Sequence, residues 1–506
     1  MREPVAVAAT RDQEPFLTAA TELITRRGID GTRYRFFYYD DDAIIDGVVS
    51  RNFRYFCLSC TFVLPELERR LQQVSQPFDD DTVGIVSFAA SPVVLMMSPQ
   101  VHGRLRRVDG GVGWRSLLAR DSVVRLMQAH VATPDGMAVL MALATAAGAD
   151  LDRRPADAAN GAPDGFVSHI QQTVMEYGPD DAAVVRHGLP EGRWRADVLA
   201  VQERSAFNAA ERYPDLPAVI VHPNDGTAWA HHALCRIATE QSADDAAFFE
   251  LARALCDAEL NGVYRSHGLW PADHERGSDD PSRLLHHTRE LGRPIPPANV
   301  QMVGDPGEPP SPPARRLLRV LRGYGADVKR SSDVCLVLDT STSMSGARLA
   351  AAKHGLLAFL DRLEGPDANV CVILFNDQPM AAVPLQPVTV GRAAVETALA
   401  QAKADGGTAL LDAVGMALDV LDAADSTGNI KALVVLTDGE ENRSSSTVKG
   451  TISRLDTTDQ VFFGIAYGNQ AGRRLLATLA GASGGHSLVT DEDGIETAYE
   501  VLARHL

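Results

Sequence analysis

The stretch Asp333-Val-Cys-Leu-Val-Leu-Asp339-Thr-Ser341-Thr-Ser343-Met decides the fold of the C-terminal part of the chain. An apolar, β-branched run ends in one acid and two hydroxyl side chains at alternate positions. Such a run is typical of a strand that is buried on both faces of a parallel sheet. The polar side chains then follow the strand onto its loop, at the edge of an α/β sheet where ligands bind.

Two later stretches have the same character and extend the pattern. A glycine turn presents a hydroxyl group before a predicted helix, and a second apolar strand ends in an acid and a glycine. Together the three stretches supply only hard oxygen donors, which suit Mg²⁺ or another hard divalent ion such as Mn²⁺ or Ca²⁺. The later stretches are Asp405-Gly-Gly-Thr408-Ala-Leu-Leu-Asp412 and Lys431-Ala-Leu-Val-Val-Leu-Thr437-Asp438-Gly-Glu440-Glu441.

The order Asp-x-Ser-x-Ser, loop Thr, then strand-Thr-Asp-Gly resembles the von Willebrand factor type A (VWA) domain. The resemblance implies a Rossmann-like α/β domain with a mostly parallel sheet at residues 331–506. It also implies a metal-ion-dependent adhesion site, in which the hydroxyl groups bind the ion directly and the acids act partly through water. One coordination position then stays open for an acidic group of a partner protein. The five matching residues are Asp339, Ser341, Ser343, Thr408 and Asp438.

One position departs from that pattern, because Thr342 stands where the family often has Gly. We expect this residue to be tolerated, since its side chain can point away from the ion. The alternative interpretation is that the five residues are ordinary turn and helix-capping residues, for which Asp, Ser and Thr are favoured.

Length and charge limit the remaining possibilities. A chain of 506 residues is too long for one core, so two or three domains are expected. The net charge of −18 argues against nonspecific binding of nucleic acid or anionic membranes. The sequence contains no run of about 18 apolar residues, so no membrane span is expected. The first residues lack a signal-peptide core, so a cytoplasmic location is expected, or an extracytoplasmic one if a signal was trimmed.

Residues 1–297 alternate between strand and helix patterns, which predicts an α/β domain with a largely parallel sheet. Several stretches resemble a type II periplasmic-binding-protein (solute-binding) fold, namely residues 5–14, 88–99, 114–118, 133–136 and 220–227. Bacterial proteins join this domain to a C-terminal VWA domain. The resemblance implies two lobes with a ligand cleft. Plain capping is the favoured alternative for each residue that could line this cleft: Thr10, Ser59, Ser91, Thr133 and Asp135.

The stretch between the two predicted domains, residues 298–330, is rich in Pro and Gly at its start and predicts a semi-rigid linker followed by a short helix. The pair Cys57-Leu-Ser-Cys60 resembles a thioredoxin redox motif, although its surroundings fit the solute-binding pattern better. Cys335 and Cys371 are predicted to be small core residues without a disulfide. The pairs His231-His232 and His286-His287 lack a zinc-binding spacing, so surface or core roles are expected.

The leading functional hypothesis is a non-enzymatic adaptor whose VWA domain binds an acidic side chain of a partner through Mg²⁺. By resemblance to intracellular bacterial VWA proteins, a MoxR-type AAA+ ATPase is a candidate partner. A second hypothesis is a small-molecule receptor that uses the VWA domain as an assembly platform. A third is a hydrolytic enzyme, which needs a general base beside an open metal position, and the sequence offers no distinct one. Glu440 and Glu441 are expected at the rim of the ion site.

Overall fold

A computed structural model describes most of the chain and divides it into two compact units. The first unit contains Met1–Ile170, Asp180–Val185 and Gly192–Gly325, and the second contains Gln171–Pro179, Arg186–Glu191 and Ala326–Leu506. The described residues are 5–74, 83–109, 111–118, 124–148, 165–237, 245–272, 293–306, 329–363, 368–426, 428–438, 441–458, 460–467, 470–491, 494–503 and 505–506.

The N-terminal part of the chain is built on a mixed sheet of eleven strands. Apolar runs of four to nine residues form most of the strands, as the sequence pattern predicts. The strands are β1 (Val5–Thr10), β2 (Tyr34–Tyr39), β3 (Tyr55–Leu58), β4 (Val83–Met97), β5 (Leu126–Ala129), β6 (Val174–Gly178), β7 (Val198–Gln202), β8 (Ala218–Val221), β9 (Trp229–Ile237), β10 (Trp270–Pro271) and β11 (Val300–Val303).

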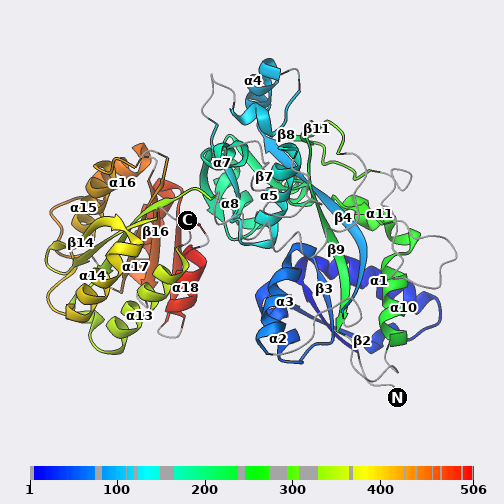
Figure 1. Cartoon of the computed structure of the whole chain (residues 1–506), viewed down its shortest axis with the longest axis horizontal. Helices are drawn as coiled ribbons and strands as arrows, with labels where there is room; N and C mark the ends of the chain where they lie inside the picture. Colours follow the sequence, from blue (N-terminus) through cyan, green and yellow to red (C-terminus); the bar gives the residue numbers. More distant parts are fainter. Residues whose placement is uncertain are drawn as a thin grey trace. The chain divides into compact units, whose positions relative to one another are not determined.

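The strand order along this sheet is β2-β1-β3-β9-β4-β7-β5-β6, with β8 and β10 also paired to β4 and β11 paired to β8. The long strand β4 pairs antiparallel with β9 along its first part and with β7 and β8 along its last part. Within the first unit, β4 and β9 therefore connect two groups of elements, drawn in dark blue and in cyan (Figure 1). One sequence prediction is corrected here. The sheet is mixed and not largely parallel, because β9 runs antiparallel to β3 and β4, and β4 runs antiparallel to β7 and β8.

Helices cover both faces of the β1–β2–β3 region. Phe16 of the first helix packs with Phe88 and Tyr264 in one buried cluster, whereas Ile44 and Leu67 belong to a second cluster. The helices of this part of the chain are α1 (Glu14–Arg26), α2 (Asp41–Val49), α3 (Leu64–Gln73), α4 (Pro99–Asp109), α5 (Pro134–Ala146), α7 (Phe166–Gln171), α8 (Asp181–Gly188), α9 (Glu203–Arg212), α10 (Asp245–Leu255) and α11 (Asn261–Ser266).

The second unit has a six-stranded sheet that is parallel except at one edge. Numbered from its first strand, the spatial order is 3-2-1-4-5-6, which is the order of a doubly wound α/β sheet. Its strands are β12 (Ser332–Asp339), β13 (Asn369–Phe375), antiparallel β14 (Pro379–Pro387), β15 (Ile430–Thr437), β16 (Val461–Tyr467) and β17 (His486–Thr490).

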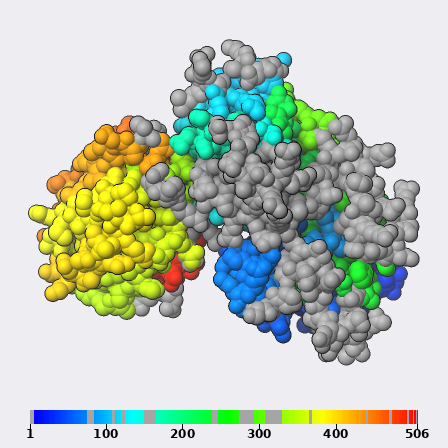
Figure 2. All heavy atoms as spheres, viewed as in Figure 1, coloured from blue at the N-terminus to red at the C-terminus, as the bar shows by residue number. Residues whose placement is uncertain are grey.

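Both faces of the two central strands are buried, as continuous apolar runs require. Cys335 and Val337 belong to a core cluster with residues of the helices on one face. On other helices, Phe359 and Tyr499 pack with ring centroids 5.6 Å apart. In Figure 2, the yellow region of β14 and the next helix makes up much of the visible face of the second unit. The helices are α13 (Ala347–Arg362), α14 (Val388–Gln401), α15 (Leu410–Asp422), α16 (Val448–Thr457), α17 (Gln470–Ser483) and α18 (Ile495–Ala503).

Two further differences from the sequence predictions concern local pairing. Cys335 and Cys371 are buried as predicted, but they form a disulfide, because the register of β12 and β13 places them directly opposite with Cα atoms 4.8 Å apart. Val300–Val303, within the stretch predicted to be a linker, forms β11 and pairs with β8. Among the described residues, no helix combines the length and apolar character that crossing a bilayer requires.

Candidate metal centre

The strand order of the second unit creates a site at the carboxyl ends of β12 and β15. The chain reverses its winding direction between these two neighbouring strands, and ligands of doubly wound sheets bind at such a point. Leu338 pairs with Leu436, so the next polar residues of both strands emerge side by side. The fold therefore brings Asp339 and Asp438 to the same edge of the sheet.

A continuous chain of hydrogen bonds joins four of the five predicted metal ligands. The backbone N–H of Ser341 donates to Asp339 Oδ1 at 2.7 Å. The hydroxyl oxygens of Ser341 and Ser343 lie 3.0 Å apart, and Ser343 Oγ donates to Asp438 Oδ1 at 2.7 Å. The predicted residues thus converge, although they come from segments about a hundred positions apart along the chain.

The fifth residue, Thr408, lies on a loop that is hydrogen-bonded to the segments that follow β12 and β15. Gly406 O accepts hydrogen bonds from the N–H and the hydroxyl of Thr342, at 3.1 and 3.0 Å. On its other side, Thr408 N–H donates to Asn442 Oδ1 at 3.0 Å. The side chain of Thr342 thus binds this loop, so the position that departs from the family pattern serves to hold Thr408 in place.

The electrostatics of the site favour a cation. Asp339 is fully buried, and this burial raises its pKa to about 6, with a smaller contribution from the nearby charge of Asp438. Two further residues, which the sequence analysis missed, contact these acids. Thr437 Oγ1 donates to Asp339 Oδ2 at 2.5 Å, and Arg348 Nη1 lies 2.7 Å from Asp438 Oδ2. Thr437 directly precedes an acid of the motif, but no sequence signal marked Arg348.

The residues present fit a hard divalent ion. Two carboxylates and two hydroxyl groups form one hydrogen-bonded set, and every side-chain atom of this set that could bind an ion is an oxygen. Asp339, Ser341, Thr408 and Asp438 are buried, whereas Ser343 is exposed at the rim. A cation here would relieve the repulsion between the two acids and still be reachable from solvent.

The comparison with known proteins agrees with this geometry. The von Willebrand factor type A domain family matches residues 333–500, which span β12 and most of α18. Residues 333–500 form a VWA domain. VWA domains often bind a divalent cation.

Several known proteins are similar to part of the chain. The uncharacterized protein sll0103 of Synechocystis sp. is 33% identical over 143 residues, which are 28% of this chain and 33% of that protein. A von Willebrand factor type A structure from Catenulispora acidiphila shares 22% identity, with 35% of this chain and 43% of that chain covered and a TM-score of 0.32. BatB from Bacteroides thetaiotaomicron shares 16% identity, with 34% and 98% covered and a TM-score of 0.30. The chain spans about a third of the curated relative's length.

Glu441, the second of the two acids after β15, has a structural role. Glu441 accepts hydrogen bonds from Leu411 N, at the start of α15, and from Arg443 N and Ser444 N, at 2.7–2.9 Å. Its carboxylate is therefore a capping group that closes the turn beside the VWA metal site. Gly439 and Glu440 lie outside the described residues.

The five residues predicted for an N-terminal cleft occupy strand ends, β4 and the start of α5. Ser91 Oγ accepts the N–H of Arg204, whose guanidinium pairs with Asp12, two residues after Thr10. Thr133 caps α5 by accepting from Gly136 N, as the capping alternative predicts. Asp135 accepts hydrogen bonds from the Asp181 N–H and the Gln202 side chain, and Ser59 is half-buried after β3.

The remaining sequence motifs have structural roles. Cys57 and Cys60 are free and buried, and burial raises the pKa of both thiols, which argues against a reactive thiolate. His231 and His232 are buried in β9 and contact Ser87 and Gln13, which confirms a core role. His286 and His287 lie outside the described residues.

Proposed function

We propose that the VWA domain binds a divalent cation at Asp339, Ser341, Ser343, Thr408 and Asp438, and through it an acidic side chain of a partner protein. The supporting observation is the hydrogen-bonded set of oxygen donors at the switch point of the sheet. The exposed rim at Ser343 leaves one side of a bound cation accessible to a carboxylate. Mg²⁺, Mn²⁺ and Ca²⁺ all accept such a donor set.

We infer that this site has a binding role and no hydrolytic one. Among the described residues, the side chains that contact the two acids are hydroxyls and Arg348, and none of these is an ordinary general base. Residues 481–485 match the spacing Gly-x-Ser-x-Gly, but they form the end of α17 and the turn before β17, whereas a nucleophile elbow joins a strand to a helix. Ser483 Oγ there accepts the Phe462 N–H and donates to Ala480 O.

The whole protein would then be an adaptor. Its partner would be a protein that presents a carboxylate to the cation. A MoxR-type AAA+ ATPase is our candidate partner, on the resemblance to bacterial VWA proteins alone. Such an interaction needs no catalytic group, which agrees with the donor set described above.

Binding of a purified MoxR-type ATPase to the immobilised chain tests the proposal. We expect retention with 5 mM Mg²⁺, loss with EDTA, and loss in Asp339→Ala. Asp361→Ala is the matched control, because Asp361 is an exposed VWA aspartate paired with Arg392. Isothermal titration with Mg²⁺ alone separates the two parts of the proposal. If Asp339→Ala bound Mg²⁺ as tightly as Asp361→Ala, the cation site itself would be wrong; intact Mg²⁺ binding without retention would reject this partner.

A second candidate function is supported by the polar groups of the first unit. We propose that this unit is a solute-binding domain whose ligand contacts the network around Asp12, Asp135 and Arg204. Asp135 and Asp181 share the backbone and side chain of Gln202, and Asp181 Oδ1 is buried without a hydrogen bond to a described residue. A thermal-shift panel of amino acids, sugars and anions tests it, with Asp135→Asn expected to abolish any shift and Asp361→Ala to keep it.

A further inference from the structure

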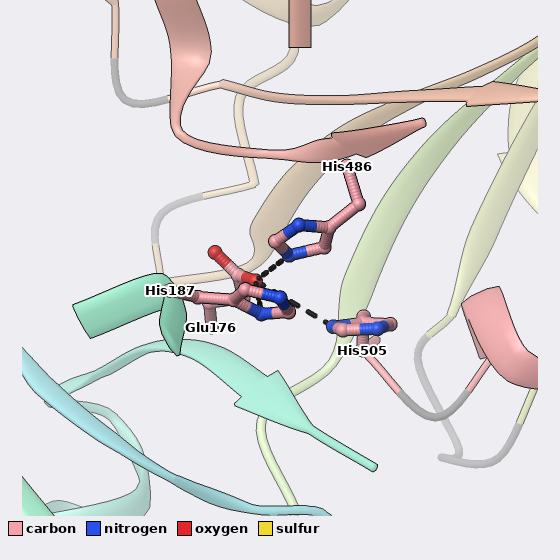
Figure 3. Close-up of side chains that lie close together, drawn as sticks. All are labelled: Glu176, His187, His486 and His505. Carbon is pink, nitrogen blue, oxygen red and sulfur yellow. Dashed lines mark hydrogen bonds and ion pairs between the residues drawn. The ribbon is translucent and has the colours of Figure 1, made fainter. Parts of the chain in front are cut away.

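Four side chains that can bind a metal converge in the second unit at a place unrelated to the VWA cation site. Glu176 lies on β6, His187 near the end of α8, His486 at the first residue of β17, and His505 next to the C-terminal residue. Figure 3 shows the three rings gathered around the Glu176 carboxylate. The four residues come from two regions more than 300 positions apart, so no local spacing in the sequence could reveal them.

The distances are close to those of a metal site. Glu176 Oε1 lies 2.9 Å from His486 Nε2 and 3.5 Å from both His187 Nδ1 and His505 Nδ1. One ligand atom from each residue can be chosen so that all four lie within 4.8 Å of one another. Four ligands at about 2.0–2.1 Å from a tetrahedral zinc ion lie about 3.4 Å apart. Side-chain movements of the order of 1 Å would therefore convert this arrangement into a tetrahedral site.

The surroundings require a compensating charge and offer nitrogen ligands. Glu176 is fully buried, and His187 and His505 are nearly so. A buried carboxylate is costly unless a cation or hydrogen bonds accompany it. His187 Nδ1 is buried, and apart from its 3.5 Å approach to Glu176 Oε1 it makes no hydrogen bond to a described residue.

One interaction competes with metal binding and one contact must relax. His505 Nδ1 lies 2.9 Å from Tyr177 O, and binding through this nitrogen exchanges that hydrogen bond for a metal bond. The rings of His187 and His486 are stacked with centroids 3.2 Å apart, so they must separate slightly to direct their nitrogens at one ion. Both changes are side-chain movements and leave the backbone in place.

We propose that Glu176, His187, His486 and His505 form a structural zinc site. Imidazole and carboxylate ligands suit Zn²⁺, and four protein ligands make a closed site of the structural kind. The ion would join Gln171–Pro179 and Arg186–Glu191 to β17 and to His505, stabilising this part of the second unit.

Zinc titration of the full-length, chelator-treated chain tests the site. In 5 mM Mg²⁺ and with Asp339→Ala as background, so that the VWA site does not contribute, we expect one Zn²⁺ per chain by competition with a chromogenic chelator. Glu176→Gln and His486→Gln should weaken binding at least tenfold. His354→Gln is the matched control, because its side chain is 76% exposed in the same unit. Co²⁺ in place of Zn²⁺ should show the visible absorption of a tetrahedral site, and His486→Gln should abolish it.

Three outcomes would overturn the proposal. These are no Zn²⁺ bound in the Asp339→Ala background, equal affinity in His486→Gln and His354→Gln, or an octahedral Co²⁺ spectrum. Circular dichroism checks that each variant is folded. If Glu176→Gln fails to fold, the His486→Gln comparison still decides, because that side chain is partly exposed at the start of β17.

Discussion

At the scale of single residues, Asp438 is the acid on which the VWA site depends most directly. Its two oxygens have different partners: Oδ1 accepts the Ser343 hydroxyl, and Oδ2 lies 2.7 Å from the Arg348 guanidinium. A cation bound at the proposed site would therefore compete with Arg348 for the same carboxylate. The Arg348 side chain is 43% exposed, so it can swing into solvent when a cation binds.

We expect Arg348→Gln to tighten Mg²⁺ binding about fivefold, because removing the competing positive charge of a half-exposed ion pair is worth about 1 kcal/mol. Isothermal titration of the chain with Mg²⁺ measures this change. Arg392→Gln is the control, since Arg392 forms similar exposed ion pairs away from the site. Unchanged or weaker Mg²⁺ binding in Arg348→Gln would show that the guanidinium does not compete with the ion.

At the scale of elements, the loop that carries Thr408 depends on Gly406. This residue has φ +75°, a conformation that costs other residues about 1 kcal/mol or more. An added Cβ would also lie 2.7 Å from Asp377 Oδ2. Gly406 O receives both hydrogen bonds from Thr342, so its backbone conformation sets the distance between the Thr408 loop and the end of β12.

We expect Gly406→Ala to lower the free energy of unfolding by about 1–2 kcal/mol and to weaken Mg²⁺ binding as the loop shifts. Denaturant unfolding and Mg²⁺ titration measure the two effects. Gly481→Ala is the contrasting variant, because Gly481 is a helical residue of α17 with no described atom within 4 Å of an added Cβ. That substitution should be neutral or slightly stabilising, and an equal loss in both variants would contradict the role of Gly406.

At the scale of the whole molecule, the first unit holds several carboxyl groups whose pKa is raised by burial. The pKa of Asp41 rises to about 8 and that of Asp135 to about 6, and Asp181 is shifted in the same direction. Repulsion between these acids adds to the effect, since the negative charges of Asp135 and Asp12 raise the pKa of Asp41 further. The folded unit therefore holds protons that the unfolded chain, with an Asp pKa near about 3.9, releases.

The sign of the pH dependence follows directly. Because the folded state binds more protons at these raised carboxyls, their contribution to stability is complete below the unfolded Asp pKa and falls as the pH rises toward 8, with a slope of up to about 1.4 kcal/mol per pH unit for each such proton. Scanning calorimetry between pH 6 and 9 should show the transition of the first unit moving to lower temperature. Asp41→Asn should flatten this dependence, whereas Asp42→Asn should not. A transition that rises with pH would contradict the assignment.

The scales differ in how far the sequence alone could predict them. The bounds of β13 and most of β12, β15 and β16 follow from apolar runs that are local in the chain. The continuous β4, the mixed N-terminal sheet and β11 do not, because strand pairing depends on partners far away in sequence. Four of the five predicted metal ligands form one hydrogen-bonded set, since β12 and β15 end at one edge of a parallel sheet.

By itself the sequence determined which oxygen donors stand at the ends of β12 and β15 and on the loop before α15, because strand ends and glycine turns are set by neighbouring residues. Only the tertiary structure decided that Arg348 contacts Asp438, that Cys335 faces Cys371, and that His187, His486 and His505 surround Glu176. The physical reason is that these contacts depend on register and side-chain packing between distant segments, which leave no periodic signal in the chain.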